Sequence, residues 1–180
     1  MAPAPLAPVP VLRQLNEQVR ANRLPQGRAA RTLHEVAAPR PSRVLIADDH
    51  PLIRDALRQD LEQGGLEVCA EVSTGADAIT AAVRERPDLC LLDMQMPANG
   101  IAAVKAIRQA LPATKVVLIT ATPDETGIVA AAHAGADGYL PKDVNPQRLA
   151  QIVSAVIDGE TAYPRRLLRV LLRALMQPDP

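Results

Sequence analysis

Three short runs in which apolar residues follow one another without a break constrain the fold most. They are VLIA at 44–47, DLCLL at 88–92 and KVVLIT at 115–120. Strands that are apolar at every position are buried on both faces, as in a parallel sheet covered by helices. A fourth run, LEVCAEV at 66–72, alternates instead, which predicts an edge strand whose apolar side chains share one side: Leu66, Val68, Ala70 and Val72.

Helical patterns fill the gaps between these runs, and a short fifth strand is expected at 137–141. Two helix starts have recognisable signatures. In TPDE, Thr122 and Glu125 form a capping box with a proline at the first helical position, and Asn145 precedes Pro146 in the same way. Five strands alternating with five helices predict a doubly wound α/β domain over about residues 43–160.

The segments on either side of this domain differ from it in composition. Residues 1–42 are rich in Pro, Ala and Arg, and we expect an extension that is partly disordered, with a short helix at 11–24. Residues 161–180 predict an amphipathic tail helix whose apolar stripe needs a partner, either this domain or a second copy. The stripe is expected to contain Leu168, Leu171, Leu172 and Leu175.

Composition excludes several classes of partner. Residues 44–160 carry nine basic against seventeen acidic residues, and the chain has two Tyr but no Trp or Phe. Such an acidic body lacks a phosphate-tracking groove and a stacking platform, so we expect no direct contact with nucleic acid. No apolar run approaches the roughly 18 residues that span a bilayer, and the proline-rich start is a poor secretory signal, so we expect a cytoplasmic protein without membrane contact.

Cysteines and histidines give no sign of a metal site of their own. Cys69 and Cys90 lie in apolar, strand-like runs and are expected to be buried free thiols. The histidines are scattered along the chain, and each is expected to be solvated or at a helix end rather than to act as a ligand: His34, His50 and His133.

Polar residues follow the carboxyl ends of the predicted strands. Asp48 and Asp49 come after the first strand, Asp93 after the third, Thr120 after the fourth and Lys142 after the fifth. Each alone is best explained as a helix cap or a solvated side chain. Together they should meet at one edge of the sheet, where open α/β sheets bind their ligands.

The charges at this edge do not balance. Three carboxylates repel one another, by about 4 kcal/mol for each pair at 4 Å and an effective dielectric of 20, and Lys142 offsets only one of them. The remaining charge of −2 calls for a divalent cation, and an all-oxygen site suits Mg²⁺. The sequence therefore predicts a metal-binding, phosphate-accepting site.

Four motifs now carry a resemblance to a known family: VLIADDHPLIRDAL, LLDMQMP, VVLIT and GYLPKD. In order and spacing they resemble the receiver domain of two-component response regulators, and DDHPLIR and GYLPKD are similar to its NarL/FixJ-type branch. The resemblance covers residues 43–160. It implies a flavodoxin-like sheet with strand order 2-1-3-4-5.

The resemblance also implies roles for the acidic residues. Asp93 would be the phospho-acceptor, taking a phosphoryl group from a phosphohistidine on a sensor histidine kinase. Asp49 and Asp93 would hold Mg²⁺ together with the backbone carbonyl of Gln95, and Asp48 would help through a water molecule.

Three further residues match the signalling part of the family. Thr120 and Lys142 would bind the new phosphoryl oxygens, and Tyr139 would be the switch that turns as the threonine moves; an ordinary half-buried strand tyrosine is the alternative. Two positions depart from the family pattern. Gly100 comes one residue earlier than in many relatives, which indicates a shortened loop, and Asp143 stands where many have proline.

Other functions stay open at this point. An aspartate-nucleophile phosphatase of the haloacid-dehalogenase type would need an acid two residues after its nucleophile, where this chain has Gln95. A flavin or nucleotide binder would need a glycine-rich or hydroxyl-rich loop after the first strand. No helix-turn-helix follows the tail in this sequence, so we expect either a transcriptional regulator whose effector is absent here or a stand-alone receiver. A homodimer through the last helices is a further hypothesis.

Overall fold

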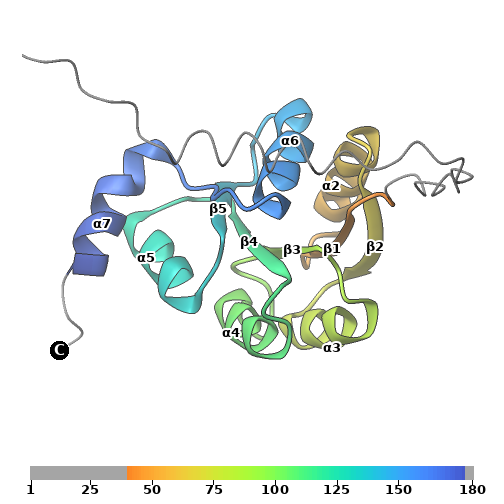
Figure 1. The fold of residues 1–180 in the computed structure, drawn as a ribbon, viewed down its shortest axis with the longest axis horizontal. Helices are drawn as coiled ribbons and strands as arrows, with labels where there is room; N and C mark the ends of the chain where they lie inside the picture. Colours follow the sequence, from red (N-terminus) through yellow and green to blue (C-terminus); the bar gives the residue numbers. More distant parts are fainter. Residues whose placement is uncertain (1–39, 177–180) are drawn as a thin grey trace, which may run out of the picture. The chain divides into compact units, whose positions relative to one another are not determined.

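A five-stranded parallel sheet forms the centre of the structure, a computed structural model that describes residues 40–176 (Figure 1). The strand order β2-β1-β3-β4-β5 confirms the predicted topology. The strands are β1 (Arg43–Ala47), β2 (Glu67–Val72), β3 (Leu89–Asp93), β4 (Lys115–Thr120) and β5 (Gly138–Pro141). Residues 1–39, including the helix expected at 11–24, lie outside the described part of the chain.

Helices cover both faces of the sheet (Figure 1). They are α2 (Pro51–Gln63), α3 (Gly75–Glu85), α4 (Gly100–Ala110), α5 (Glu125–Ala134), α6 (Pro146–Ile157) and α7 (Leu168–Met176), the last preceded by a 3₁₀ turn at Arg165–Leu167. Helices α2 and α6 lie on one face, and α3, α4 and α5 on the other. Every connection between strands that are consecutive in the chain therefore crosses over through a helix, as parallel pairing requires.

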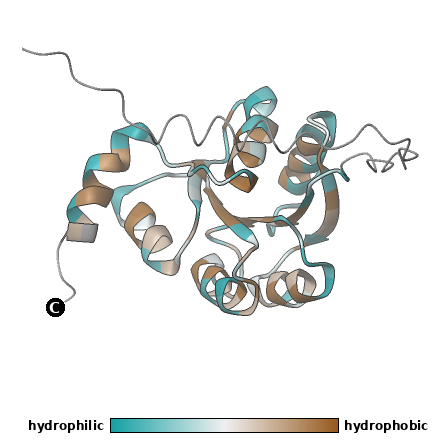
Figure 2. Cartoon of the chain, in the orientation of Figure 1, coloured by the Kyte–Doolittle hydropathy of each residue, from teal (hydrophilic) through white to brown (hydrophobic). Residues whose placement is uncertain are grey.

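Two apolar cores result from this arrangement, one on each side of the sheet. Within β1, Val44 and Ile46 face α2 and α6, whereas Leu45 and Ala47 face α3 and α4. Strands β3 and β4 alternate in the same way, and all their apolar side chains are fully buried. Figure 2 shows these central strands in the most hydrophobic colours. The unbroken apolar runs thus mark strands buried on both faces, as predicted.

Strand β2 departs from the predicted alternation. Val44 pairs with Val68, but Leu45 pairs with Ala70, so the ladder skips Cys69 at a bulge. Because one extra residue reverses the side-chain alternation, Val68 packs on the α2/α6 side and Ala70 on the α3/α4 side. The expectation that Leu66, Val68, Ala70 and Val72 share one side was wrong, although β2 is an edge strand.

Both cysteines are free thiols, as expected. Cys90 is fully buried, and burial raises the pKa of its thiol to about 12. Cys69 is half-buried, and its Sγ donates to the carbonyl oxygen of Val44 at 3.4 Å. Burial also raises the pKa of Cys69.

Helix α5 begins two residues later than its sequence signature predicts. Asp124, not Thr122, is the N-cap, and its carboxylate accepts from the backbone N–H of Gly127 at 2.6 Å. The backbone N–H of Thr122 instead donates to the hydroxyl of Thr120, which holds Thr122 in the loop. The start of α6 agrees with the prediction, since Asn145 caps Gln147 and Pro146 is the first helical residue.

The tail helix α7 packs against α5 of the same domain. Leu167 and Leu171 are buried in the core cluster that contains Ala131 and Ala134 of α5. Leu168 and Leu172, which were predicted on the same stripe as Leu171, are 38% and 60% exposed. This domain therefore covers only part of the predicted stripe, and Leu167 of the 3₁₀ turn is buried together with Leu171. The side chain of Leu175 lies outside the description.

Charged groups at the amino edge of the sheet are closely matched. Asp88 accepts from the backbone N–H of Arg43 at 2.8 Å and pairs with Arg40 at 3.0 Å. Asp137 accepts from the backbone N–H of Val116 at 2.9 Å, and its carboxylate lies 3.4 Å from Lys115 Nζ and 3.6 Å from Arg108 Nη1. Each of these two carboxylates therefore has both a backbone donor and a cation.

Candidate functional site

The predicted polar residues do meet at the carboxyl edge of the sheet. Asp93 and Thr120 are the last residues of β3 and β4, Asp48 follows β1 directly, and Lys142 follows β5. The side chains of Asp48, Asp93 and Thr120 are at most 2% exposed. Asp49 is the outermost of the group, with about one third of its side chain exposed.

Lys142 joins the two buried carboxylates. Its Nζ lies 2.7 Å from Asp48 Oδ2 and 2.9 Å from Asp93 Oδ2. Burial alone would lower the pKa of Lys142, but the carboxylates of Asp48 and Asp93 outweigh burial and raise it. Lys142 is therefore a fixed positive charge between the two acids at neutral pH.

The loop after β3 holds Asp93 from the other side. The backbone N–H of Gln95 donates to Asp93 Oδ1 at 3.1 Å. The loop returns closely to β3, because a Cβ placed on Gly100 would lie only 2.2 Å from the carbonyl oxygen of Asp93. Glycine is thus required at the start of α4, and the close contact fixes the backbone on which Asp93 is carried.

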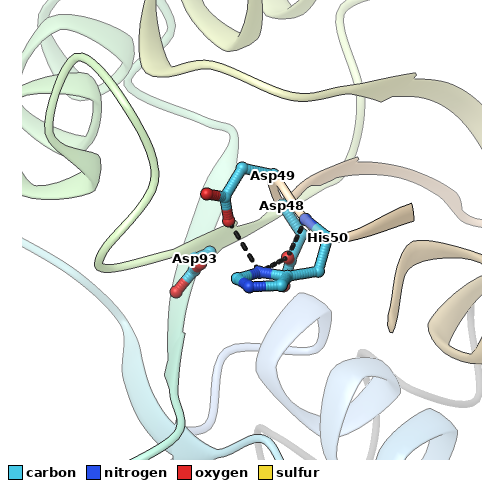
Figure 3. A group of neighbouring side chains, drawn as sticks. All are labelled: Asp48, Asp49, His50 and Asp93. Carbon is cyan, nitrogen blue, oxygen red and sulfur yellow. Dashed lines mark hydrogen bonds and ion pairs between the residues drawn. The ribbon is translucent and has the colours of Figure 1, made fainter. Parts of the chain in front are cut away.

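His50 lies between the two acids that follow β1 (Figure 3). Its Nδ1 is 2.8 Å from Asp49 Oδ1 and 3.3 Å from Asp48 Oδ1, and its backbone N–H donates to Asp48 Oδ1 at 2.8 Å. His50 is also the N-cap of α2 and is 64% exposed, which agrees with its interpretation as a solvated helix-end residue.

Two contacts of the site were not anticipated from the sequence. One is the approach of the His50 ring to both acids, for which the adjacency in DDH is the only sequence signal. The other is Arg54, whose guanidinium donates to the backbone carbonyl of Asp48 at 2.6 Å. Arg54 lies one helical turn after His50, a spacing that many surface residues share, so nothing in the sequence pattern singles it out.

The geometry of these donors fits a metal ion. Asp48, Asp49, His50 and Asp93 each offer a ligand atom, and the four atoms lie within 4.8 Å of one another. Asp48 Oδ2 is buried, and the ammonium of Lys142, 2.7 Å away, is shared with Asp93. Carboxylate oxygens in excess of nearby cations are the donor set that Mg²⁺ prefers. The cluster could therefore hold a divalent cation.

Thr120 and Tyr139 continue the site into the core. Tyr139, on β5, is fully buried, and its hydroxyl accepts weakly from the backbone N–H of Asp124 at 3.4 Å. Burial raises the pKa of Tyr139, and the nearby carboxylate of Asp124 raises it further. Hydrogen bonds with the backbone of Asp124 and the side chain of Thr120 oppose this rise. Tyr139 is therefore more deeply buried than a half-exposed strand tyrosine.

Comparison with known proteins agrees with this geometry. The family of response regulator receiver domains matches residues 44–154. The chain belongs to this family. Its relatives include the uncharacterized transcriptional regulatory protein YxjL of Bacillus subtilis, 40% identical over 123 residues, and the nitrate/nitrite response regulator NarP of Escherichia coli, 37% identical over 133 residues.

Those alignments cover 67% and 73% of this receiver chain, which spans 56% of YxjL and 62% of NarP. Among solved structures, the receiver domain of the putative response regulator NarL from Mycobacterium tuberculosis is 34% identical with a TM-score of 0.65, covering 68% of this chain and all of that one. A LuxR-family response regulator from Aurantimonas is 27% identical with a TM-score of 0.69, covering 77% of this chain and all of that one. The NarL-type resemblance is thus confirmed.

No helix among residues 40–176 of this receiver is long and apolar enough to cross a membrane.

Proposed function

We propose that this receiver is a phosphorylation switch in which Asp93 accepts a phosphoryl group from the phosphohistidine of a sensor histidine kinase. The observation that carries the proposal is the placement of Asp93. It is 2% exposed at the end of β3, 2.9 Å from Lys142 Nζ, and shares a cluster of possible metal ligands with Asp48 and Asp49.

In the proposed transfer, a carboxylate oxygen of Asp93 forms a bond to phosphorus as the bond from phosphorus to the histidine nitrogen breaks. The electron pair of the broken bond returns to the imidazole. Such a transfer depends on positioning and on neutralising charge rather than on covalent help from other side chains. The N–H of Gln95 and the ammonium of Lys142, which hold the Asp93 oxygens, supply the positioning.

Asp48, Asp49 and Asp93, with the Gln95 carbonyl, would hold the metal ion, and Mg²⁺ suits their oxygen donors. When bound, Mg²⁺ supplies positive charge that offsets the phosphoryl oxygens. Phosphorylation replaces the single charge of Asp93 by about −2. The added charge would draw Lys142 and the Thr120 hydroxyl inward, and Tyr139 would respond to the movement of Thr120.

The output we propose is control of transcription through an effector that this sequence does not include. Support comes from the relatives, since YxjL is described as a transcriptional regulatory protein and NarP as a nitrate/nitrite response regulator. A stand-alone receiver that acts through protein contacts in the cytoplasm is the alternative. Dimerisation through the C-terminal helices belongs to the same proposal, and sedimentation with and without beryllofluoride tests it.

Acetyl phosphate and Mg²⁺ test the phospho-acceptor directly. Intact-mass measurement should show a gain of one phosphoryl group in the wild type and in the control variant Asp55→Asn, whose carboxylate is exposed on α2. The variant Asp93→Asn should show none. Modification that persists in Asp93→Asn would contradict the assignment, and rapid multiple-turnover release of phosphate would favour the phosphatase.

A further inference from the structure

Helix α5 contains a glycine at a position where glycine weakens a helix. Gly127 is the third residue of α5 and is buried. Because alanine would favour the helix, a glycine here calls for a reason in the packing. The reason lies on β5, since a Cβ placed on Gly127 would be 2.3 Å from the hydroxyl oxygen of Tyr139 and 3.0 Å from the ring carbon that carries it. Gly127 therefore leaves the space in which the Tyr139 hydroxyl lies.

The backbone of Tyr139 is fixed on both sides of β5. On one side Tyr139 pairs with Leu118 of β4. On the other side the chain that follows α6 returns to the sheet, where Ala162 forms a parallel bridge with Gly138 and the N–H of Tyr139 donates to the Ala162 carbonyl at 2.7 Å. A group added at Gly127 would therefore displace the side chain of Tyr139 rather than its backbone.

The Tyr139 hydroxyl lies next to the proposed phosphorylation site. Leu118 and Thr120 are two residues apart on β4, so their side chains share the face of the sheet on which Tyr139 packs. The hydroxyl accepts from the backbone N–H of Asp124 at 3.4 Å. Burial raises the pKa of Tyr139, and a hydrogen bond with the Thr120 side chain opposes that rise. The position of Tyr139 therefore bears on Thr120, one of the two groups proposed to bind the phosphoryl oxygens.

We propose that Gly127 is a positioning residue, which leaves room for the Tyr139 hydroxyl beside Thr120 and so keeps Thr120 in place before Asp93 is modified. With a side chain at position 127 the Tyr139 hydroxyl would have to leave, and Thr120 would lose this partner. A protein whose binding-competent arrangement is only partly populated binds its ligand more weakly in proportion. The helix thus loses some stability at Gly127, and the site gains a preset arrangement. This inference rests on the proposed function of Asp93.

Binding of beryllofluoride with Mg²⁺, a mimic of the phosphoryl group, tests the role of Gly127 when its affinity is measured by fluorine NMR. Gly127→Ala should bind it about tenfold more weakly than the wild type, within the roughly 5- to 150-fold range typical of coupling between two sites. The same change made in Tyr139→Phe, which lacks the hydroxyl, should alter the affinity by less than about twofold. The control Thr126→Ala, exposed on the same turn of α5, should match the wild type.

Two further measurements report on the tyrosine itself and cover poor folding of Gly127→Ala. Because alanine favours a helix over glycine, the change should raise the urea midpoint in the Tyr139→Phe background but not where the hydroxyl is present. In a Tyr163→Phe background Tyr139 is the only tyrosine of the chain. Quenching of its fluorescence by iodide should increase when Gly127→Ala is added.

The outcomes separate this inference from the proposed function. Wild-type affinity in Gly127→Ala, or an equal loss of affinity with and without the Tyr139 hydroxyl, overturns the role of Gly127 and leaves the proposed function intact. An equal rise of the urea midpoint in both backgrounds, or unchanged quenching of Tyr139, does the same. Failure of the wild type to bind beryllofluoride in the presence of Mg²⁺ overturns both.

Discussion

The two edges of the sheet treat buried charge in opposite ways. At the amino edge, Asp137 has a backbone N–H and two cations within 3.6 Å, and Asp88 is similarly matched. At the carboxyl edge, the carboxylates of Asp48 and Asp93 share the single ammonium of Lys142, and among the described residues Asp49 is paired only with the ring of His50. Aspartate carboxylates are thus matched by donors and cations at the amino edge, whereas at the carboxyl edge they outnumber the cations.

This difference separates stability from function within one sheet. A matched carboxylate stabilises the fold, because its removal leaves donors without an acceptor. Carboxylates in excess destabilise the empty site, and they persist only where a ligand of opposite charge relieves them. The contrast therefore locates the ligand-binding edge from charge balance alone, and substitutions at the two edges should have different effects on stability.

The largest effect is expected for Lys142→Met at the carboxyl edge. Removing the one cation leaves Asp48 and Asp93 buried without compensation, which should lower the free energy of unfolding by about 3–5 kcal/mol. Urea denaturation without divalent ions measures this change, and added Mg²⁺ should restore part of the loss. The matched change at the amino edge, Lys115→Met, should cost less than about 1 kcal/mol, because Asp137 keeps Arg108 and its backbone donor. Equal losses in the two variants would contradict the contrast.

An intermediate effect, opposite in sign at the two edges, is expected when one carboxylate is neutralised. Asp93→Asn should raise the free energy of unfolding by about 1 kcal/mol in buffer without Mg²⁺, because it reduces repulsion among the three acids. Asp137→Asn should lower it by about 1 kcal/mol, because the ion pairs with Lys115 and Arg108 are lost. Thermal and urea unfolding of the two variants provide the measurement. Destabilisation by Asp93→Asn would show that its carboxylate is not in excess.

The smallest effect concerns pH at the amino edge, where Tyr163 donates to the carbonyl of Ala136. In the folded state its pKa is about 12, above the value near 10 of an unfolded tyrosine, so the native state keeps the proton longer. Its contribution to stability is complete below pH 9 and is lost as the pH rises from about 10 to 12. By linkage the loss at pH 10.5 is about 1 kcal/mol.

Urea unfolding of the wild type and of Tyr163→Phe between pH 8.5 and 10.5 checks this expectation. The phenylalanine variant should be less stable at pH 8.5, and the difference between the two proteins should shrink as the pH rises. A constant difference across this range would exclude a role for the Tyr163 proton.

A buried parallel sheet could be predicted from the sequence, because unbroken apolar runs leave few alternatives to it, and the strand order was implied by the family resemblance. Local details could not. The bulge at Cys69 reverses the facing of β2, and no residue type in LEVCAEV marks it. At α5, Thr122 and Asp124 are both good caps, and the hydroxyl of Thr120 decides between them by binding the N–H of Thr122. Such choices depend on contacts between segments distant in the chain.

The carboxyl-edge residues could also be predicted, because position at a strand end determines which side chains meet. Their partners could not, since the ring of His50 and the guanidinium of Arg54 reach the site only through the orientation of α2. From the sequence, the tail helix could pack either on this domain or on a second copy of it. In the structure, Leu167 and Leu171 lie in the same core cluster as Ala131 and Ala134 of α5, so the tail docks on this domain.

The bridge between Gly138 and Ala162 also bears on solubility. A parallel sheet has two outer strands, each of which can template pairing with a foreign chain. On β2 the exposed carboxylates of Glu67 and Glu71, together with the bulge, discourage such pairing. Strand β5, GYLP, carries no charged side chain, and the bridge to Ala162 occupies its free edge. Truncating the chain before residue 160 would therefore open a neutral edge to intermolecular strand addition, so shortened versions of this protein should aggregate more readily.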